Sequence, residues 1–232
     1  MPDCGNGVRE GGEECDGTDF GDATCPGSSA SGALLCAEDC TLDTSECPPV
    51  AAEECGNCID DDANGLTDYE DPSCCTAPRR FPMVLRKGGI TRSKKKQETR
   101  LRLRSILSSS GMADVDPSKE TVYLQLRDPA GASILCARIP ATSFKSKRGK
   151  RFKFRDRDGG LASAGGLRRV SIVKAKDGSV RLLAKGKGVP FDVPSAGAIE
   201  ITAAFAPAEG DAVCSAARRP FRAGKNGKLV FP

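Results

Sequence analysis

The sequence predicts a mainly β protein, in which a small disulfide-rich head precedes an antiparallel β-sandwich of the jelly-roll or immunoglobulin-like kind. Ten of the twelve cysteines lie in the first 78 residues. Those residues also hold 19 acidic side chains against one arginine, a net charge of −18, whereas residues 79–232 hold 34 basic and 12 acidic side chains, a net charge of +22. Beyond residue 79, apolar and polar residues alternate with the period of two that is typical of strands with one buried face.

These shifts in composition place a domain boundary near Ala77–Arg80. We expect a disulfide-rich repeat over residues 1–48, a cysteine-clamped loop over residues 49–78 and a basic β-sandwich domain over residues 79–232. The opposite charges of the two regions bear on partners and association rather than on the fold.

The head has too few large apolar side chains to fold by burial alone. Burial contributes about 2 kcal/mol for each such side chain, whereas ordering costs about 1–2 kcal/mol for every residue. Three disulfides at roughly 2–4 kcal/mol each would have to close much of that gap, and six cysteines allow 15 pairings. The larger apolar side chains of residues 1–47 are Val8, Phe20, Leu34, Leu35 and Leu42.

The cysteines favour disulfides over zinc, because the chain has no histidine and Cys74 and Cys75 are adjacent. We therefore expect an oxidising, extracytoplasmic location. Cys136 and Cys214 fall in two different predicted strands, so one bridge between them would link distant strands; the alternative is two separately buried thiols. The cysteines expected in disulfides are Cys4, Cys15, Cys25, Cys36, Cys40, Cys47, Cys55, Cys58, Cys74, Cys75, Cys136 and Cys214.

An aspartate-rich loop within residues 53–75 has the spacing of a calcium site, D-x-D-x-N-G-x-x-D, with Gly65 supplying the sharp turn. Its carboxylates would repel one another without a cation, so the loop either splays into solvent or holds a metal. The glutamate expected at position 12 of an EF-hand loop is replaced by Asp71, and no flanking helices are predicted. The expected calcium ligands are Asp60, Asp62, Asn64, Leu66, Asp68 and Asp71.

Two motifs in the first third of the chain carry a family resemblance. The string Cys4-Gly5-Asn6-Gly7, followed by GEECDG, DC and DTS before Cys47, resembles the cysteine-rich repeats of secreted and surface proteins of myxobacteria. The loop that begins Cys55-Gly56-Asn57-Cys58 resembles a second repeat that often accompanies them, and its aspartates are similar to thrombospondin type 3 loops. Tyr69 stands where a further cysteine is frequent. The resemblance implies an extracellular or cell-envelope protein and carries no catalytic activity.

The body is predicted to contain about nine short antiparallel strands. Asp177-Gly178 and Asn226-Gly227 each join two of them, and both dipeptides accept the positive φ values of two-residue hairpin turns. The expected strands are residues 99–106, 121–127, 133–139, 151–155, 167–176, 179–187, 198–205, 213–222 and 228–231.

Nothing in the sequence points to catalysis. The absence of histidine removes the usual hydroxyl–histidine–acid systems, and no phosphate-binding loop, nucleophile elbow or dinucleotide motif occurs. A pair of acids acting on a glycoside has little support, because the body has only 12 acidic residues and few aromatics for a sugar platform. We expect no enzymatic activity.

Clusters of basic residues in the body permit two interpretations. They engage a polyanion, or they solubilise outward strand faces and discourage edge pairing. Phe144, Phe152 and Phe154 alternate with basic residues and are expected on the buried side of a strand, so a specific nucleic-acid ligand that stacks on aromatics is not expected. The candidate polyanion-binding residues are Lys94, Lys95, Lys96, Lys145, Lys147, Arg148, Lys150 and Arg151.

The sequence as a whole predicts a secreted or cell-surface structural and interaction protein with a calcium-stabilised head. One alternative is an extracellular filament in which the acidic head docks on the basic body of the next molecule. The other is an adhesin that binds acidic polysaccharide or extracellular DNA. No apolar run reaches the length of a membrane span, and residues 1–3 do not begin a signal peptide, so an export signal is expected outside this numbering.

Overall fold

The chain forms two compact units in the computed structural model. The first unit contains residues 1–52 and 60–64, and the second contains residues 53–59 and 65–232. The expected boundary near Ala77–Arg80 therefore lies inside the second unit. The residues that the structure describes are 4–25, 34–47, 52–93, 97–107, 111–112 and 114–231.

The first unit is held together by three disulfides. They join Cys4 to Cys40, Cys15 to Cys36 and Cys25 to Cys47. Its regular structure consists of two short strands, β1 (Leu35–Cys36) and β2 (Leu42–Asp43), which pair antiparallel. Within the described part of this unit, the buried apolar side chains are those of three cysteines and of Leu34. Covalent links thus take the place of an apolar core.

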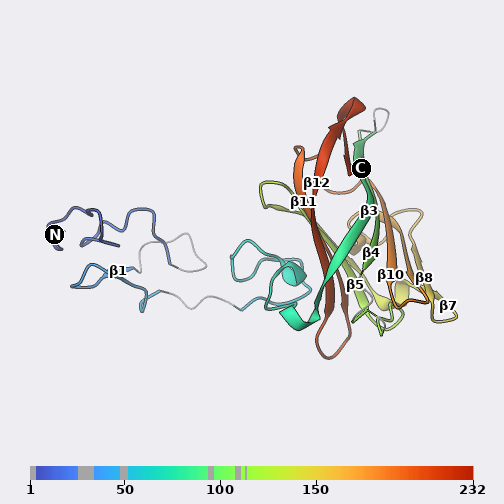
Figure 1. Cartoon of the computed structure of the whole chain (residues 1–232), viewed down its shortest axis with the longest axis horizontal. Helices are drawn as coiled ribbons and strands as arrows, with labels where there is room; N and C mark the ends of the chain where they lie inside the picture. The colour runs from blue at the N-terminus through green and yellow to red at the C-terminus, as the bar shows by residue number, and fades with distance from the viewer. Residues whose placement is uncertain are drawn as a thin grey trace. The chain divides into compact units, whose positions relative to one another are not determined.

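The second unit is built on one sheet of eleven strands, and the expected mainly β, antiparallel class is confirmed. The strand order is β6-β5-β11-β12-β13-β3-β4-β10-β9-β8-β7. Figure 1 labels most of these strands. The strands are β3 (Arg80–Arg92), β4 (Thr99–Leu107), β5 (Thr121–Arg127), β6 (Ser133–Ile139), β7 (Lys145–Lys147), β8 (Arg151–Arg155), β9 (Leu167–Lys174), β10 (Val180–Lys187), β11 (Gly197–Ala206), β12 (Val213–Gly224) and β13 (Lys228–Phe231).

Helical structure in the described residues is limited to short 3₁₀ turns. No helix there is long or apolar enough to cross a membrane. The turns are η1 (Asp68–Glu70), η2 (Ala77–Arg79), η3 (Ala141–Ser143), η4 (Ala162–Ala164) and η5 (Lys225–Gly227).

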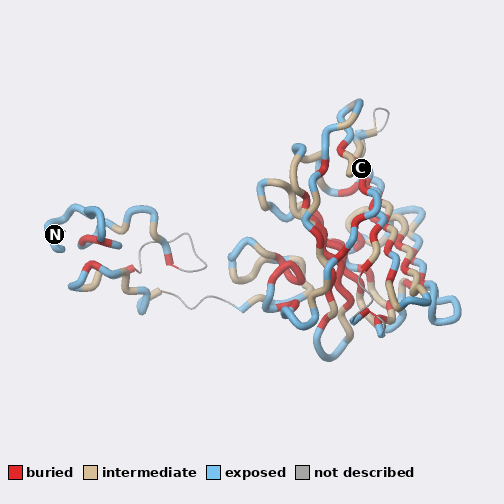
Figure 2. The backbone as a smooth tube through the Cα atoms, viewed as in Figure 1, coloured by how far each residue is buried: buried red, intermediate tan, exposed pale blue. Residues whose placement is uncertain are grey.

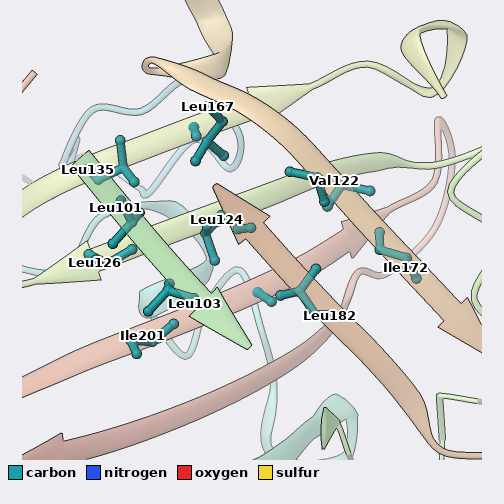
Figure 3. Close-up of a cluster of buried hydrophobic side chains, with 14 of the residues drawn as sticks. Leu101, Leu103, Val122, Leu124, Leu126, Leu135, Leu167, Ile172, Leu182 and Ile201 are labelled. Atoms are coloured by element: carbon teal, nitrogen blue, oxygen red, sulfur yellow. The ribbon is translucent and has the colours of Figure 1, made fainter. Parts of the chain in front are cut away.

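The sheet curls so that its two halves enclose a single apolar core. Figure 3 shows Leu101 and Leu103 of β4 and Leu182 of β10 close to Leu124 of β5 and Ile201 of β11. The two halves meet at β3, whose first residues pair parallel with β12 and whose later residues pair antiparallel with β4 and β13. The two layers that the sequence led us to expect are therefore halves of one continuous sheet.

All nine expected strands are present, each within two residues of its expected bounds, and β3 and β7 are additional in the second unit. Both expected hairpins are confirmed as strand pairs, but neither has the expected two-residue turn. At Asn226-Gly227, Gly224 pairs with Lys228, so the loop holds three residues, which form η5. The turn at Asp177-Gly178 differs from the expected two-residue type, because Ala175 N donates to Ser179 O at 2.8 Å and only Gly178 of the dipeptide has a positive φ, of 79°. This geometry is that of a three-residue loop with its last residue in the left-handed region.

Residues 53–59 and 65–79, which we call the cover, pack on the outer face of β5, β11 and β12. Two disulfides attach the cover, Cys58–Cys136 to β6 and Cys75–Cys214 to β12, and Cys55–Cys74 closes it internally. The expected bridge between Cys136 and Cys214 is therefore wrong, and the alternative of two buried thiols is wrong as well. Each of these cysteines faces the cover, so a cysteine of the cover is nearer than the other strand cysteine.

The contacts between the cover and the sheet are specific. Gln125 Nε2 donates to Thr67 O at 2.8 Å, and the rings of Tyr69 and Tyr123 lie 4.6 Å apart. A guanidinium nitrogen of Arg80 donates to the carbonyls of Tyr69, Glu70 and Asp71. Burial and hydrogen bonds thus join the cover to the sheet in addition to the disulfides.

Candidate polyanion-binding face

Six consecutive strands of the sheet contain no acidic residue. They are β3, β4, β10, β9, β8 and β7, and each carries at least two lysines or arginines. Exposed and buried residues alternate along these strands (Figure 2). Because successive strand side chains point to opposite faces, the basic residues of these strands gather on the face directed away from the core.

The inward side chains of these strands are apolar and buried. Phe152 and Phe154 of β8 are 0% and 3% exposed, which confirms the expected orientation of these aromatics. The outward side chains are mainly lysine and arginine. We define the basic face by the fourteen outward-pointing residues Arg86, Lys87, Arg100, Arg102, Arg104, Lys145, Lys147, Arg151, Lys153, Arg155, Arg169, Arg181, Lys185 and Lys187.

The strand register places many of these charges directly opposite one another. Arg102 of β4 pairs with Lys185 of β10, which pairs with Arg169 of β9, which pairs with Arg155 of β8. Directly opposed side chains have Cβ atoms about 4.5–5.5 Å apart, where like charges destabilise the pair. A row of four cations therefore costs folding free energy unless an anion neutralises it.

Acidic partners on this face are scarce. Within the described residues, the only basic side chain of the face with a carboxylate within 4.0 Å is Arg100, whose Nη2 lies 3.0 Å from Glu98 Oε1. A surface that serves only solubility mixes the two signs of charge and avoids this repulsion. The one-sided composition favours the interpretation that the face engages a polyanion.

A hollow of about 420 Å³ lies on the face between β3, β4 and β10. Gly88, Gly89 and Gly186 contribute to its lining. Five cations surround them, which suits an anionic group that approaches the backbone closely. These cations are Lys87, Arg100, Arg102, Lys185 and Lys228.

The sequence identified only part of this face. Of the expected polyanion-binding residues, Lys145, Lys147 and Arg151 lie on it, and Arg148 and Lys150 lie in the turn between β7 and β8. Residues 94–96, the Lys94-Lys95-Lys96 cluster, fall outside the described residues.

Sequence reasoning missed the arginines of β4 and the cations of β10 as members of the same site. The signal was present in residues 99–106, where arginine alternates with leucine. That alternation shows that the arginines point outward, but it does not show that they share a face with β8 and β10. The strand order and register supply this missing information.

The expected calcium ligands divide between the two units. Asp60, Asp62 and Asn64 belong to the first unit, where Asp62 accepts hydrogen bonds from the backbone N and the Nδ2 of Asn64 at 3.1 and 2.8 Å. Leu66, Asp68 and Asp71 belong to the second unit. Calcium binding by residues 60–64, which keep hard oxygen donors, stays a prediction.

Asp68 has a different role from that of an exposed metal ligand. It is fully buried, and its carboxylate accepts hydrogen bonds from the backbone N atoms of Gly56, Asn57 and Cys58 at 2.6–3.0 Å. Burial raises the pKa of Asp68 above its ordinary value, against the lowering effect of these three donors. The nearby sulfur of Cys136 is in a disulfide and is not a metal-binding thiolate.

The same arrangement occurs in the first unit. Asp16 is buried there and accepts hydrogen bonds from the backbone N atoms of Gly5, Asn6 and Gly7 at 2.8–3.0 Å. Consecutive backbone donors of this kind form a concave anion-binding nest. The two Cys-Gly-Asn motifs of the sequence are thus two copies of one local structure, each closed by an aspartate from further along the chain.

Glu70 is a deeply buried acid of the cover. Its side chain is 1% exposed, its carboxylate atoms have no hydrogen-bond partner among the described residues, and Arg127 Nε lies 4.0 Å from Oε2. Burial raises the pKa of Glu70 to about 7, with Arg127 acting in the opposite direction. Burial therefore makes this carboxyl a weaker acid than an exposed glutamate.

The chain matches no protein-family model, no curated protein and no solved structure, so its own residues carry the functional argument.

Proposed function

We propose that this protein is an extracytoplasmic interaction protein that binds polyanions through the basic face. The observation that carries the proposal is the set of six adjacent acid-free strands whose outward cations stand opposite one another. A sulfated, phosphorylated or carboxylated polymer would neutralise several rows at once and release the counterions that these charges hold in its absence. All twelve cysteines are in disulfides, which supports an oxidising location.

The test is salt-dependent binding to heparin and to dextran sulfate. The variant Arg102→Gln with Lys185→Gln removes two opposed cations and should weaken binding by about tenfold at low salt, corresponding to about 1.4 kcal/mol. It should also make binding less dependent on salt, because fewer counterions are released.

The matched control is Arg138→Gln with Arg222→Gln, two exposed arginines of β6 and β12 outside the basic face. It changes the net charge by the same amount and should bind nearly as well as the unaltered chain. Equal weakening by both pairs would show that net charge, and not this face, determines binding.

Head-to-tail self-association is a second function that the charges favour. The first unit carries 14 acidic residues against Arg9, a net charge of −13, and the second carries 34 basic against 17 acidic residues, a net charge of +17. A contact between the first unit of one molecule and the basic face of the next does not close and would propagate as a filament. Sedimentation velocity at about 50 mM and 1 M salt tests this, and heparin should dissociate any assembly that uses the face.

Calcium stabilisation of residues 60–64 is a third proposal, supported by their ligand spacing. A site at 100 times its dissociation constant would stabilise the folded unit by about 2.7 kcal/mol. Thermal unfolding with calcium and with chelator measures this, and Asp62→Ala should remove the difference. Identical unfolding of the unaltered protein under both conditions would exclude the site.

A further inference from the structure

Apolar side chains interrupt the basic face at one place. Ile106 of β4 and Val173 of β9 are both cross-strand partners of Arg181 on β10. Leu183 lies two residues further along β10 and therefore points to the same side. It pairs with Arg104 on one neighbouring strand and with Ser171 on the other. Three adjacent strands thus place a small apolar cluster among the cations.

This cluster forms part of the lining of a second hollow, of about 320 Å³, within the range of small-molecule sites. Its other side chains include Arg86, Arg104, Arg169 and Arg181, together with Ser171. The basic side chains lining it are all arginine, whereas the first hollow, between β3, β4 and β10, is lined by both lysine and arginine. Arginine combines a guanidinium that binds phosphate or carboxylate with an alkyl stem that lies against apolar surface.

The arginines of this hollow also retain an unused donor. Arg169 Nε is buried and has no hydrogen-bond partner among the described residues. Buried donors are normally paired, so this unpaired atom leaves the Arg169 guanidinium without a fixed partner in the protein. Arg169 stands opposite Lys185 and Arg155, which gives it no acidic cross-strand neighbour.

We infer that this hollow binds an anionic lipid, with the arginines holding the acidic headgroup and Ile106, Val173 and Leu183 contacting the first methylene groups of the chain. The inference rests on the proposed function, because the same face supplies the charge, and it narrows the ligand from any polyanion to an amphiphilic anion. A purely hydrophilic polyanion uses the cations but leaves the apolar cluster in water. A neutral lipid leaves the four guanidinium groups without an acceptor.

The experiment measures binding of hexyl, octyl and decyl phosphate below their micelle concentrations by calorimetry, with inorganic phosphate and octyl maltoside for comparison. Affinity should rise by about two- to fourfold for each added methylene, as expected for partial to full burial of each group. Inorganic phosphate should bind much more weakly than octyl phosphate, and octyl maltoside should not bind at the same concentrations.

Leu183→Ser should reduce the chain-length dependence while leaving heparin affinity within about twofold. The matched control is Ile59→Ser, because Ile59 is an apolar residue of the cover that is 57% exposed and lies outside the basic face. Ile59→Ser should keep the full chain-length dependence. Thermal unfolding of both variants verifies that each is folded.

The outcomes separate this inference from the proposed function. Heparin binding with no chain-length dependence for alkyl phosphates overturns the lipid site and leaves the polyanion proposal standing. Equal binding of octyl maltoside and octyl phosphate also overturns it, since the hollow would then be an unselective apolar patch. Chain-length dependence that Leu183→Ser reduces, with no retention on heparin, would support the lipid site and refute the general polyanion face.

Discussion

The outer faces of the two halves of the sheet differ in exposure and in charge. On β5 and β11 the outward residues include Tyr123, Gln125 and Thr202, which are 4%, 0% and 1% exposed because the cover packs on them. On β4 and β10 the corresponding residues are exposed cations with few acidic partners. The residues under the cover are thus neutral and withdrawn from solvent, and Gln125 Nε2 donates to the cover at Thr67 O, whereas the exposed half carries charges in contact with solvent.

Removing the bridge between the cover and β12 should have the largest effect on stability. Cys75→Ser with Cys214→Ser deletes a link between residues 139 positions apart, and loss of so long a loop closure should cost about 4–5 kcal/mol in urea unfolding of the sheet. The control is Cys25→Ser with Cys47→Ser, which opens a bridge of the first unit and should leave unfolding of the sheet unchanged. The same loss for both pairs would contradict the division into two units.

Glu70→Gln should alter how the stability of the covered half depends on pH. An unfolded glutamate ionises near 4.5 and folded Glu70 near 7, so between these values the unfolded chain loses a proton that the folded chain keeps. The free energy of unfolding should therefore fall by about 3 kcal/mol as the pH rises from about 4.5 to 7, with little further change above.

The Gln variant should lack this fall and should be more stable than the unaltered protein at pH 8. Thermal unfolding at pH 4, 6 and 8 measures it, with Glu209→Gln, an exposed position, as the control. A steeper or unchanged pH dependence in Glu70→Gln would show that another group controls it.

Asp68→Asn tests the nest that joins the two segments of the cover. The amide keeps the shape but loses the charge and one acceptor oxygen from a site with three backbone donors, so we expect a loss of about 2 kcal/mol. Denaturant unfolding measures this, and the exposed Asp158→Asn serves as the comparison. No change in Asp68→Asn would mean that the nest adds little to the contacts and disulfides that already hold the cover.

Arg102→Glu should produce the smallest change in stability and the opposite change in binding. A glutamate opposite Lys185 replaces repulsion by attraction, which should stabilise the sheet by roughly 0.5 kcal/mol at low salt and by less at about 1 M salt. Heparin affinity should fall in the same variant. The variant Arg102→Gln removes the repulsion without adding an attraction, so it separates the two effects on stability. If Arg102→Glu binds heparin as well as the unaltered protein does, this row of cations has no role in binding.

The strands of the body could be predicted because their alternation of apolar and polar residues is local. β3 was missed because Pro82 and Gly88-Gly89 are typical of loops. The structure supplies a packing reason for Gly88, since a Cβ there would lie 2.6 Å from Cζ of Phe221, a residue more than 130 positions away. A local sequence pattern cannot predict that Gly88 is required by the ring of Phe221, because that ring comes from a distant strand.

The disulfides and the basic face show the same limit. Pairing Cys136 with Cys214 was reasonable for an isolated sandwich, but the cover lies over both cysteines and supplies a partner for each. The basic side chains of β7 and β8 stood out as a run of charge, whereas those of β4 and β10 join them only through strand order. Sequence reasoning found the residue types of the site but not which strands meet.

The attachment of the cover also determines the order in which the disulfides can form during synthesis. The three bridges of the first unit close between cysteines 21–36 positions apart, so they can form soon after that unit is made. Cys75 must wait for Cys214, which at about 5–20 residues per second is a delay of roughly 7–30 s. During that interval Cys75 either stays reduced or pairs with another cysteine of the cover, and in the second case disulfide exchange must precede the bridge to β12.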